Sequence, residues 1–91
     1  MNGSEDWRPY VRALIYPVQF ERDPLHGLDR VLESVEAGGV LDASPERCLG
    51  AVRTALASDE GLAELIPQGH SEDAIRRFLS ELEQRLAARA S

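Results

Sequence analysis

The residues of this sequence that could carry out chemistry are few and widely spaced. The chain has two histidines, His26 and His70, and one cysteine, Cys48. Transition-metal sites need several such ligands at short spacing, as in CxxC or HExxH patterns, and neither pattern occurs. A DxDxDG loop for calcium is also absent. The sequence therefore predicts no metal site and no cofactor, and both histidines are expected to be structural and partly exposed.

Nucleophilic catalysis is disfavoured by the context of the candidate residues. Residues 69–72, Gly-His-Ser-Glu, have suitable types, but a nucleophilic serine needs a strand-turn-helix setting. Ser71 is instead expected to cap the helix that follows it. No lysine, histidine or glycine-rich turn lies beside Cys48 to lower the pKa of its thiol, so we expect a small core residue there. We predict no catalytic residue and no enzyme.

Length and composition limit the fold and the compartment. Ninety-one residues make one domain, 1–91, near the lower size at which a chain buries its own core. No apolar run of about eighteen residues predicts a membrane span, and the acidic N-terminus does not resemble a signal peptide. A single cysteine fits a reducing compartment, so we expect a cytoplasmic protein. Ten arginines and no lysine suggest a GC-rich bacterial genome.

The segment that must position most of the others is residues 71–89. Its apolar residues recur at offsets of three and four, which places them on one face of a helix: Ile75, Phe78, Leu79, Leu82 and Leu86. The opposite face predicts four ion pairs at i,i+4: Glu72–Arg76, Asp73–Arg77, Arg77–Glu81 and Glu81–Arg85. Residues 1–5 and 89–91 are expected to be frayed tails.

Four shorter segments complete an all-α fold, which we expect to be a compact bundle of four or five short helices with a long C-terminal helix. A first helix, with Ser4 or Asp6 as its cap, begins near Asp6 and ends before Pro17, although residues 13–20 could instead be extended. Cap-then-proline pairs predict helices that begin at Asp23 and Ser44. The Asp23 helix should end at Gly38-Gly39, and Ser58 should begin a short fourth helix that ends at Pro67.

Acidic side chains are concentrated in the middle of the chain. Sixteen acids against ten arginines give a net charge of −6. Eight of the acids lie between residues 29 and 64, with only three arginines: Asp29, Glu33, Glu36, Asp42, Glu46, Asp59, Glu60 and Glu64. Such a surface repels nucleic acid and attracts a basic protein.

Aromatic residues are concentrated at the other end of the sequence. Four of the five lie in the first twenty positions: Trp7, Tyr10, Tyr16 and Phe20. They could form a lid over a thin core or a patch that faces a partner, because aromatics are enriched both in cores and in interface hot spots. Trp7 and Tyr10 are the candidates for partner contact.

Together these patterns favour a small, acidic, non-enzymatic binding protein that masks a basic surface of a protein partner. Size, charge and helicity are those expected of an immunity protein or antitoxin that neutralises a bacterial toxin. The alternative is an accessory or scaffold subunit of a larger bacterial complex, in which a partner stabilises the thin core. A DNA-binding helix-turn-helix is disfavoured because acids interleave the arginines of the last helix. We expect a monomer or homodimer.

Overall fold

The computed structural model describes residues 6–66 and 68–90. Within them the chain forms four α-helices and three short 3-10 helices, without a strand. In chain order these are α1 (Arg8–Ile15), η1 (Tyr16–Val18), η2 (Pro24–Gly27), α2 (Leu28–Glu36), α3 (Pro45–Ala57), η3 (Leu62–Glu64) and α4 (Glu72–Ala90). The predicted all-α bundle with a long C-terminal helix is confirmed.

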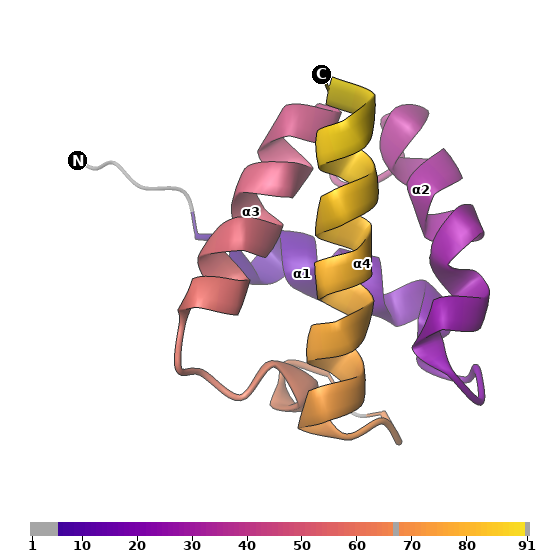
Figure 1. Cartoon of the computed structure of the whole chain (residues 1–91), viewed down its shortest axis with the longest axis vertical. Coiled ribbons are helices and arrows are strands. Elements are labelled where there is room, and N and C mark those ends of the chain that lie inside the picture. Colours follow the sequence, from indigo (N-terminus) through magenta and orange to yellow (C-terminus); the bar gives the residue numbers. More distant parts are fainter. Residues whose placement is uncertain (1–5, 67, 91) are drawn as a thin grey trace.

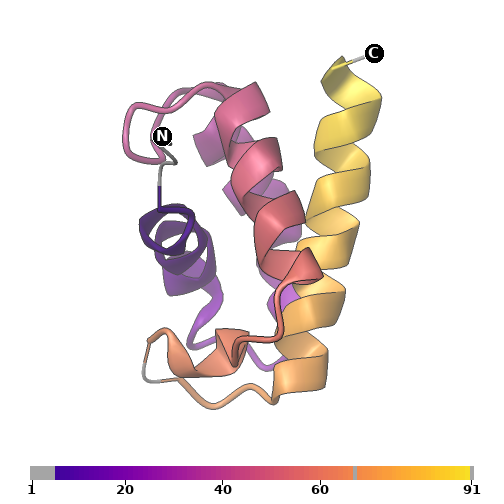
Figure 2. The same cartoon turned by 90° about the vertical axis from the view of Figure 1, so that its left-hand side faces the viewer.

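The four helices are arranged around α4. In Figure 1, α2 and α3 flank α4 on its two sides, and α1 crosses behind them. After a quarter turn α1 is seen almost end-on while α3 and α4 remain upright, so α1 runs across the other helices (Figure 2). The connection from α3 to α4 closes the end of the bundle at which α4 begins (Figures 1 and 2).

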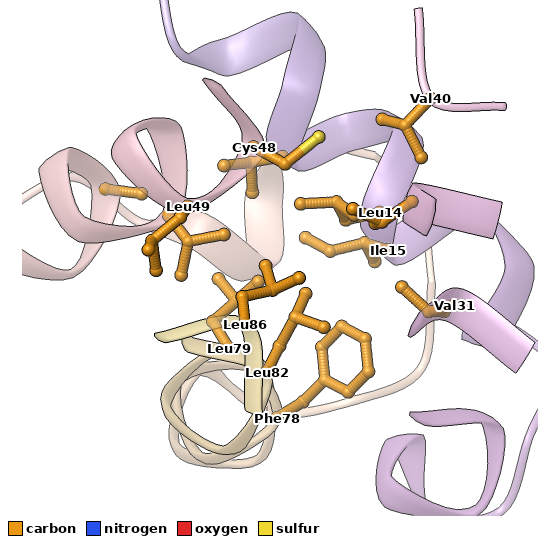
Figure 3. Close-up of a cluster of buried hydrophobic side chains, with 14 of the residues drawn as sticks. Leu14, Ile15, Val31, Val40, Cys48, Leu49, Phe78, Leu79, Leu82 and Leu86 are labelled. Carbon is orange, nitrogen blue, oxygen red and sulfur yellow. The ribbon is translucent and has the colours of Figure 1, made fainter. Parts of the chain in front are cut away.

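The apolar face of α4 supplies the largest part of one continuous core. All five residues predicted for that face are buried: Ile75, Phe78, Leu79, Leu82 and Leu86. Figure 3 shows Phe78 and Leu82 directed from α4 toward Leu14 and Ile15 of α1. Cys48 lies in the same cluster, fully buried, and its burial raises the pKa of the thiol. The predicted role of Cys48 as a core residue agrees with this position.

The N-terminal segment is helical, and the extended alternative for residues 13–20 is wrong. α1 begins at Arg8 with Pro9 in its first turn, where a missing N–H costs no hydrogen bond. Asp6 stabilises the start of α1, because its carboxylate accepts a hydrogen bond from the backbone N–H of Arg8 at 3.0 Å. The other cap considered, Ser4, lies outside the described residues. After Ile15 the chain tightens into η1 around Pro17 instead of straightening.

The expected second helix is divided into η2 and α2. Asp23 caps it as predicted, since its carboxylate accepts a hydrogen bond from the N–H of Leu25 at 3.0 Å. The first turn is a 3-10 helix, however, and α2 begins only at Leu28. Gly27 lies at the change, where a Cβ atom would come within 2.5 Å of the Val18 side chain. The close approach of η1 therefore requires glycine at this position.

The start of α3 follows the prediction, but the expected fourth helix does not form. Ser44 accepts a hydrogen bond from the N–H of Arg47 at 3.3 Å, and Pro45 occupies the first turn. Ser58 ends α3 instead of beginning a new helix, because its hydroxyl donates back to the carbonyl of Ala55 at 2.7 Å. Among the described residues of this connection, only the three of η3 are helical, and Leu62 is the one fully buried. Pro67, its predicted end, lies outside the described residues.

Two charged side chains of α4 organise the connection between α3 and α4. The Glu72 carboxylate accepts hydrogen bonds from the N–H groups of Leu62 at 3.0 Å and Ala63 at 2.8 Å, and from Arg76 at 2.8 Å. Arg76 in turn donates to the carbonyls of Leu56, Ser58 and Glu60. Burial alone raises the pKa of Glu72, but these hydrogen bonds and the Arg76 charge outweigh it and hold the pKa below its ordinary value.

The other ion pairs predicted along α4 do not form among the described residues. Glu72–Arg76 is the one that does. Instead α4 pairs with its neighbours: Arg85 with Asp29 at 3.5 Å, Arg89 with Glu36, and Glu83 with Arg53 at 3.1 Å. α4 also extends to Ala90, so Arg89, which we expected in a frayed tail, is helical. α2 and α3 lie close enough to α4 for its charged side chains to form ion pairs between helices instead of along α4.

We expect Phe78→Ala to lower the free energy of unfolding by about 3–5 kcal/mol, because it removes the largest buried side chain of the core. Chemical denaturation followed by circular dichroism measures the loss. Phe20→Ala is the matched control, since that ring is 93% exposed and its removal should change the stability by less than about 0.5 kcal/mol. Equal effects of the two changes would contradict the packing described.

We expect Glu72→Gln to lower the free energy of unfolding by about 1–3 kcal/mol at neutral pH, because the amide cannot replace all three accepted hydrogen bonds. Since folding lowers the pKa of Glu72, the carboxylate stabilises the fold above its unfolded pKa, and this contribution disappears as the pH falls through the folded pKa. As the pH is lowered, the free energy of unfolding should therefore decrease less for Glu72→Gln than for the wild type. Asp73→Asn, which removes a charge from the same turn, controls for the helix end.

Candidate functional site

The eight acids predicted to bind a partner are all exposed, but they do not form one continuous face. Five lie on α2, on the α2–α3 connection and in the first turn of α3: Asp29, Glu33, Glu36, Asp42 and Glu46. Three lie on the α3–α4 connection: Asp59, Glu60 and Glu64. The length of α3, about 20 Å for its thirteen residues, separates the two groups (Figure 1).

Arginines from outside the acidic segment neutralise part of it. Asp29 and Glu36 pair with Arg85 and Arg89 of α4, and Glu60 pairs with Arg8 of α1. The hydrogen bond to Glu36 raises the pKa of Arg89, and that to Glu60 raises the pKa of Arg8. The other five acids make no ion pair with a described residue: Glu33, Asp42, Glu46, Asp59 and Glu64. These five carry the charge that remains for a partner.

Glu36 and Glu46 are brought together near the C-terminal end of α4. They line a small hollow of about 150 Å³ together with Pro45, Leu86 and Arg89. Glu33 lies one turn before Glu36 on α2, and Asp42 lies on the connection between the two glutamates. We call Glu33, Glu36, Leu41, Asp42 and Glu46 the acidic rim. The negative end of the α2 dipole adds to the charge near Glu36, whereas the positive end of the α3 dipole lies beside Glu46 and partly offsets it.

Two residues of the rim have an unusual backbone conformation. Leu41 and Asp42 have φ angles of 54° and 55°, in the left-handed region that side chains other than glycine rarely adopt. For a leucine this costs about 1–2 kcal/mol. The side chain of Leu41 is nevertheless 54% exposed, so it does not compensate by filling the core. Strained backbone of this kind is concentrated at functional sites.

Around the second acidic group the charges are more balanced. Arg8 bonds both Asp6, at 2.9 Å, and Glu60, and its guanidinium lies 4.9 Å from the centre of the Trp7 ring. The backbone N–H of Arg8 lowers the pKa of Asp6 most strongly, and the guanidinium adds to the effect. Asp59 and Glu64 remain without an ion pair to a described residue. This group therefore offers fewer free charges than the rim.

The N-terminal aromatics are divided between the two roles considered for them. Trp7 and Tyr10 are half-buried against the core and line a hollow of about 280 Å³ with Arg47 and Gly50 of α3. Tyr16 and Phe20 are 66% and 93% exposed. Trp7 and Tyr10, the two candidates for partner contact, thus lie against α3, while the exposed aromatic surface is formed by the other two.

The described residues contain no candidate metal centre, since no three His, Cys, Asp or Glu side chains converge. His26 is exposed, and His70 is half-buried with its Nε2 atom 2.9 Å from the carbonyl of Val18. None of the helices in this part of the chain is long and apolar enough to cross a membrane.

Sequence reasoning missed one member of the rim, Leu41, and also Arg89, the arginine that pairs with another member. Leu41 carried no signal, because its backbone conformation depends on how the α2–α3 connection closes. Arg89 was expected in a tail, and its pairing with Glu36 requires the contact between α2 and α4. Comparisons with protein-family models, with curated proteins and with solved structures found no match.

Proposed function

We propose that this chain is a small, non-enzymatic binding protein that covers a basic surface of a protein partner with its acidic rim. Support comes from the acids Glu33, Asp42 and Glu46, which are exposed and make no ion pair with a described residue, and from the exposed Leu41 next to Asp42 in the chain. Unpaired acids on a surface speed the encounter with a basic partner and orient it. An immunity protein or antitoxin that neutralises a cationic bacterial toxin would act in this way in the cytoplasm.

The observation that carries the proposal is the strained backbone at Leu41 and Asp42. Folding places an apolar side chain outward among acids, in a conformation that stability alone does not favour. An interface with an apolar centre and a charged border fits this arrangement, because apolar contact supplies affinity and the border supplies orientation. Leu41 would contact an apolar point within the basic surface, and the acids would pair with the cations around it.

One capture experiment with matched variants of this chain can identify the basic partner and show which acids of the chain bind it. The rim variant Glu33→Gln/Asp42→Asn/Glu46→Gln and the control Asp59→Asn/Glu64→Gln/Asp73→Asn remove the same number of charges, all from acids without an ion pair to a described residue. Asparagine at position 42 tolerates the left-handed backbone. Wild type and control should capture the same basic protein from the native host, and the rim variant should lose most of it.

Salt supplies the second comparison. Binding by the rim should weaken strongly as salt is raised, because the attraction is between exposed charges. Equal losses for the two triple variants would show that only net charge matters and would contradict the rim as the surface. Capture of a large neutral assembly that resists salt would instead favour the accessory or scaffold subunit.

Leu41→Asn separates stability from binding. Asparagine adopts the left-handed conformation more readily than leucine, so the free energy of unfolding should stay constant or rise by up to about 1 kcal/mol. Affinity for the captured partner, measured by calorimetry, should fall by about tenfold as the apolar contact is lost. Unchanged affinity would remove Leu41 from the interface.

A further inference from the structure

A surface hollow at the opposite end of α4 from the rim gathers arginine and histidine side chains on a chain that is acidic overall. The hollow measures about 530 Å³ and lies between the η2 region and the first turns of α4. Both histidines of the chain line it, together with two of its ten arginines: His26, His70, Arg22 and Arg77. These four residues come from segments about fifty positions apart in the sequence.

The two arginines of the hollow lack carboxylate partners, unlike most arginines of the chain. Six of the ten form ion pairs with described acids: Arg8, Arg30, Arg53, Arg76, Arg85 and Arg89. Arg22 and Arg77 form none with a described residue, although Asp73 lies one turn from Arg77 on α4. Two cations that line the same hollow repel each other unless an anion lies between them.

Two other polar side chains line the hollow, and both cap helices. Asp23 is the one acid among the described lining residues, and its carboxylate accepts the N–H of Leu25 at 3.0 Å. The Ser71 hydroxyl accepts the N–H of Ala74 at 3.1 Å as the cap of α4. Two arginines against one aspartate leave the lining with an excess of positive charge.

The wall that carries His70 is held in place by hydrogen bonds. A carbonyl only accepts hydrogen bonds, so the contact of 2.9 Å to Val18 places a proton on Nε2 of His70 and fixes the ring. The Gln68 side chain accepts the N–H of His70 and donates to its carbonyl. His70 thus joins the α4 side of the hollow to η1, and the cavity is formed before any ligand enters.

We propose that this hollow binds the phosphate group of a phosphorylated small molecule. A phosphate presents several acceptor oxygens and up to two charges, and guanidinium groups bind such oxyanions with two parallel hydrogen bonds. The volume lies in the range of small-molecule pockets and exceeds the needs of the free ion. This inference is independent of the proposed protein partner, because the hollow and the acidic rim share no residue.

The chain provides its own probes for a test, because its only two histidines both line the hollow. Their imidazole signals can be followed by NMR at fixed neutral pH, while a 5′-mononucleotide or inorganic phosphate replaces chloride at constant ionic strength. We expect both ring signals to shift and saturate, with tighter binding of the mononucleotide. Arg22→Gln and Arg77→Gln should each raise the dissociation constant about tenfold.

Arg12→Gln is the matched control. Arg12 is an exposed arginine of α1 that does not line the hollow and makes no ion pair with a described residue, so the change should leave the dissociation constant unaltered. Shifts that rise without saturation, or equal weakening by Arg12→Gln, would overturn the site. Inorganic phosphate that binds as tightly as the mononucleotide would overturn the phosphorylated small molecule as its ligand.

Discussion

The hydrogen-bonded pair of Glu72 and Arg76 is the interaction on which the path of the chain most depends. Between α3 and α4 the backbone is largely irregular, yet Leu62 must be buried there and its neighbours' polar groups need partners. Glu72 satisfies two N–H groups of the connection, and Arg76 satisfies two carbonyls of the connection and one at the end of α3. By fixing the connection on the first turns of α4, the pair also places Glu60 beside Arg8 of α1.

The charged face of α4 has a second structural effect, which is to select the acids that remain exposed without a partner. Arg85 and Arg89 reach to α2 instead of pairing along their own helix, and they neutralise Asp29 and Glu36. On α2, the α2–α3 connection and the first turn of α3, the acids that keep no ion pair with a described residue are Glu33, Asp42 and Glu46. Net charge read from the sequence could not have shown this, because the arginines that cancel it lie far away in the chain.

Local patterns predicted the parts of this structure that local physics decides. The spacing of apolar residues in α4 and the caps at Asp23, Ser44 and Ser71 all act within a few residues. Other features depend on contacts between distant segments and were not predicted: the break at Gly27 against Val18, the bonds of Glu72 and Arg76 to the α3–α4 connection, and the ion pairs between α4 and its neighbours. The left-handed conformation of Leu41 and the basic hollow are of the same kind, and a single sequence carries no local signal for either.

If the rim binds a cationic partner as proposed, the pairing of Arg89 with Glu36 would make that binding depend on the number of cations that the partner brings. A tethered guanidinium competes at an effective concentration that is about millimolar or higher for a short link, whereas a free cation competes only at its own concentration. An isolated lysine or a simple salt ion would rarely displace Arg89 from Glu36. A partner surface with several cations could first bind Glu33, Asp42 and Glu46 and then replace Arg89 as the ion-pair partner of Glu36. The rim would therefore favour partners with several cations over partners with one, whatever their shape.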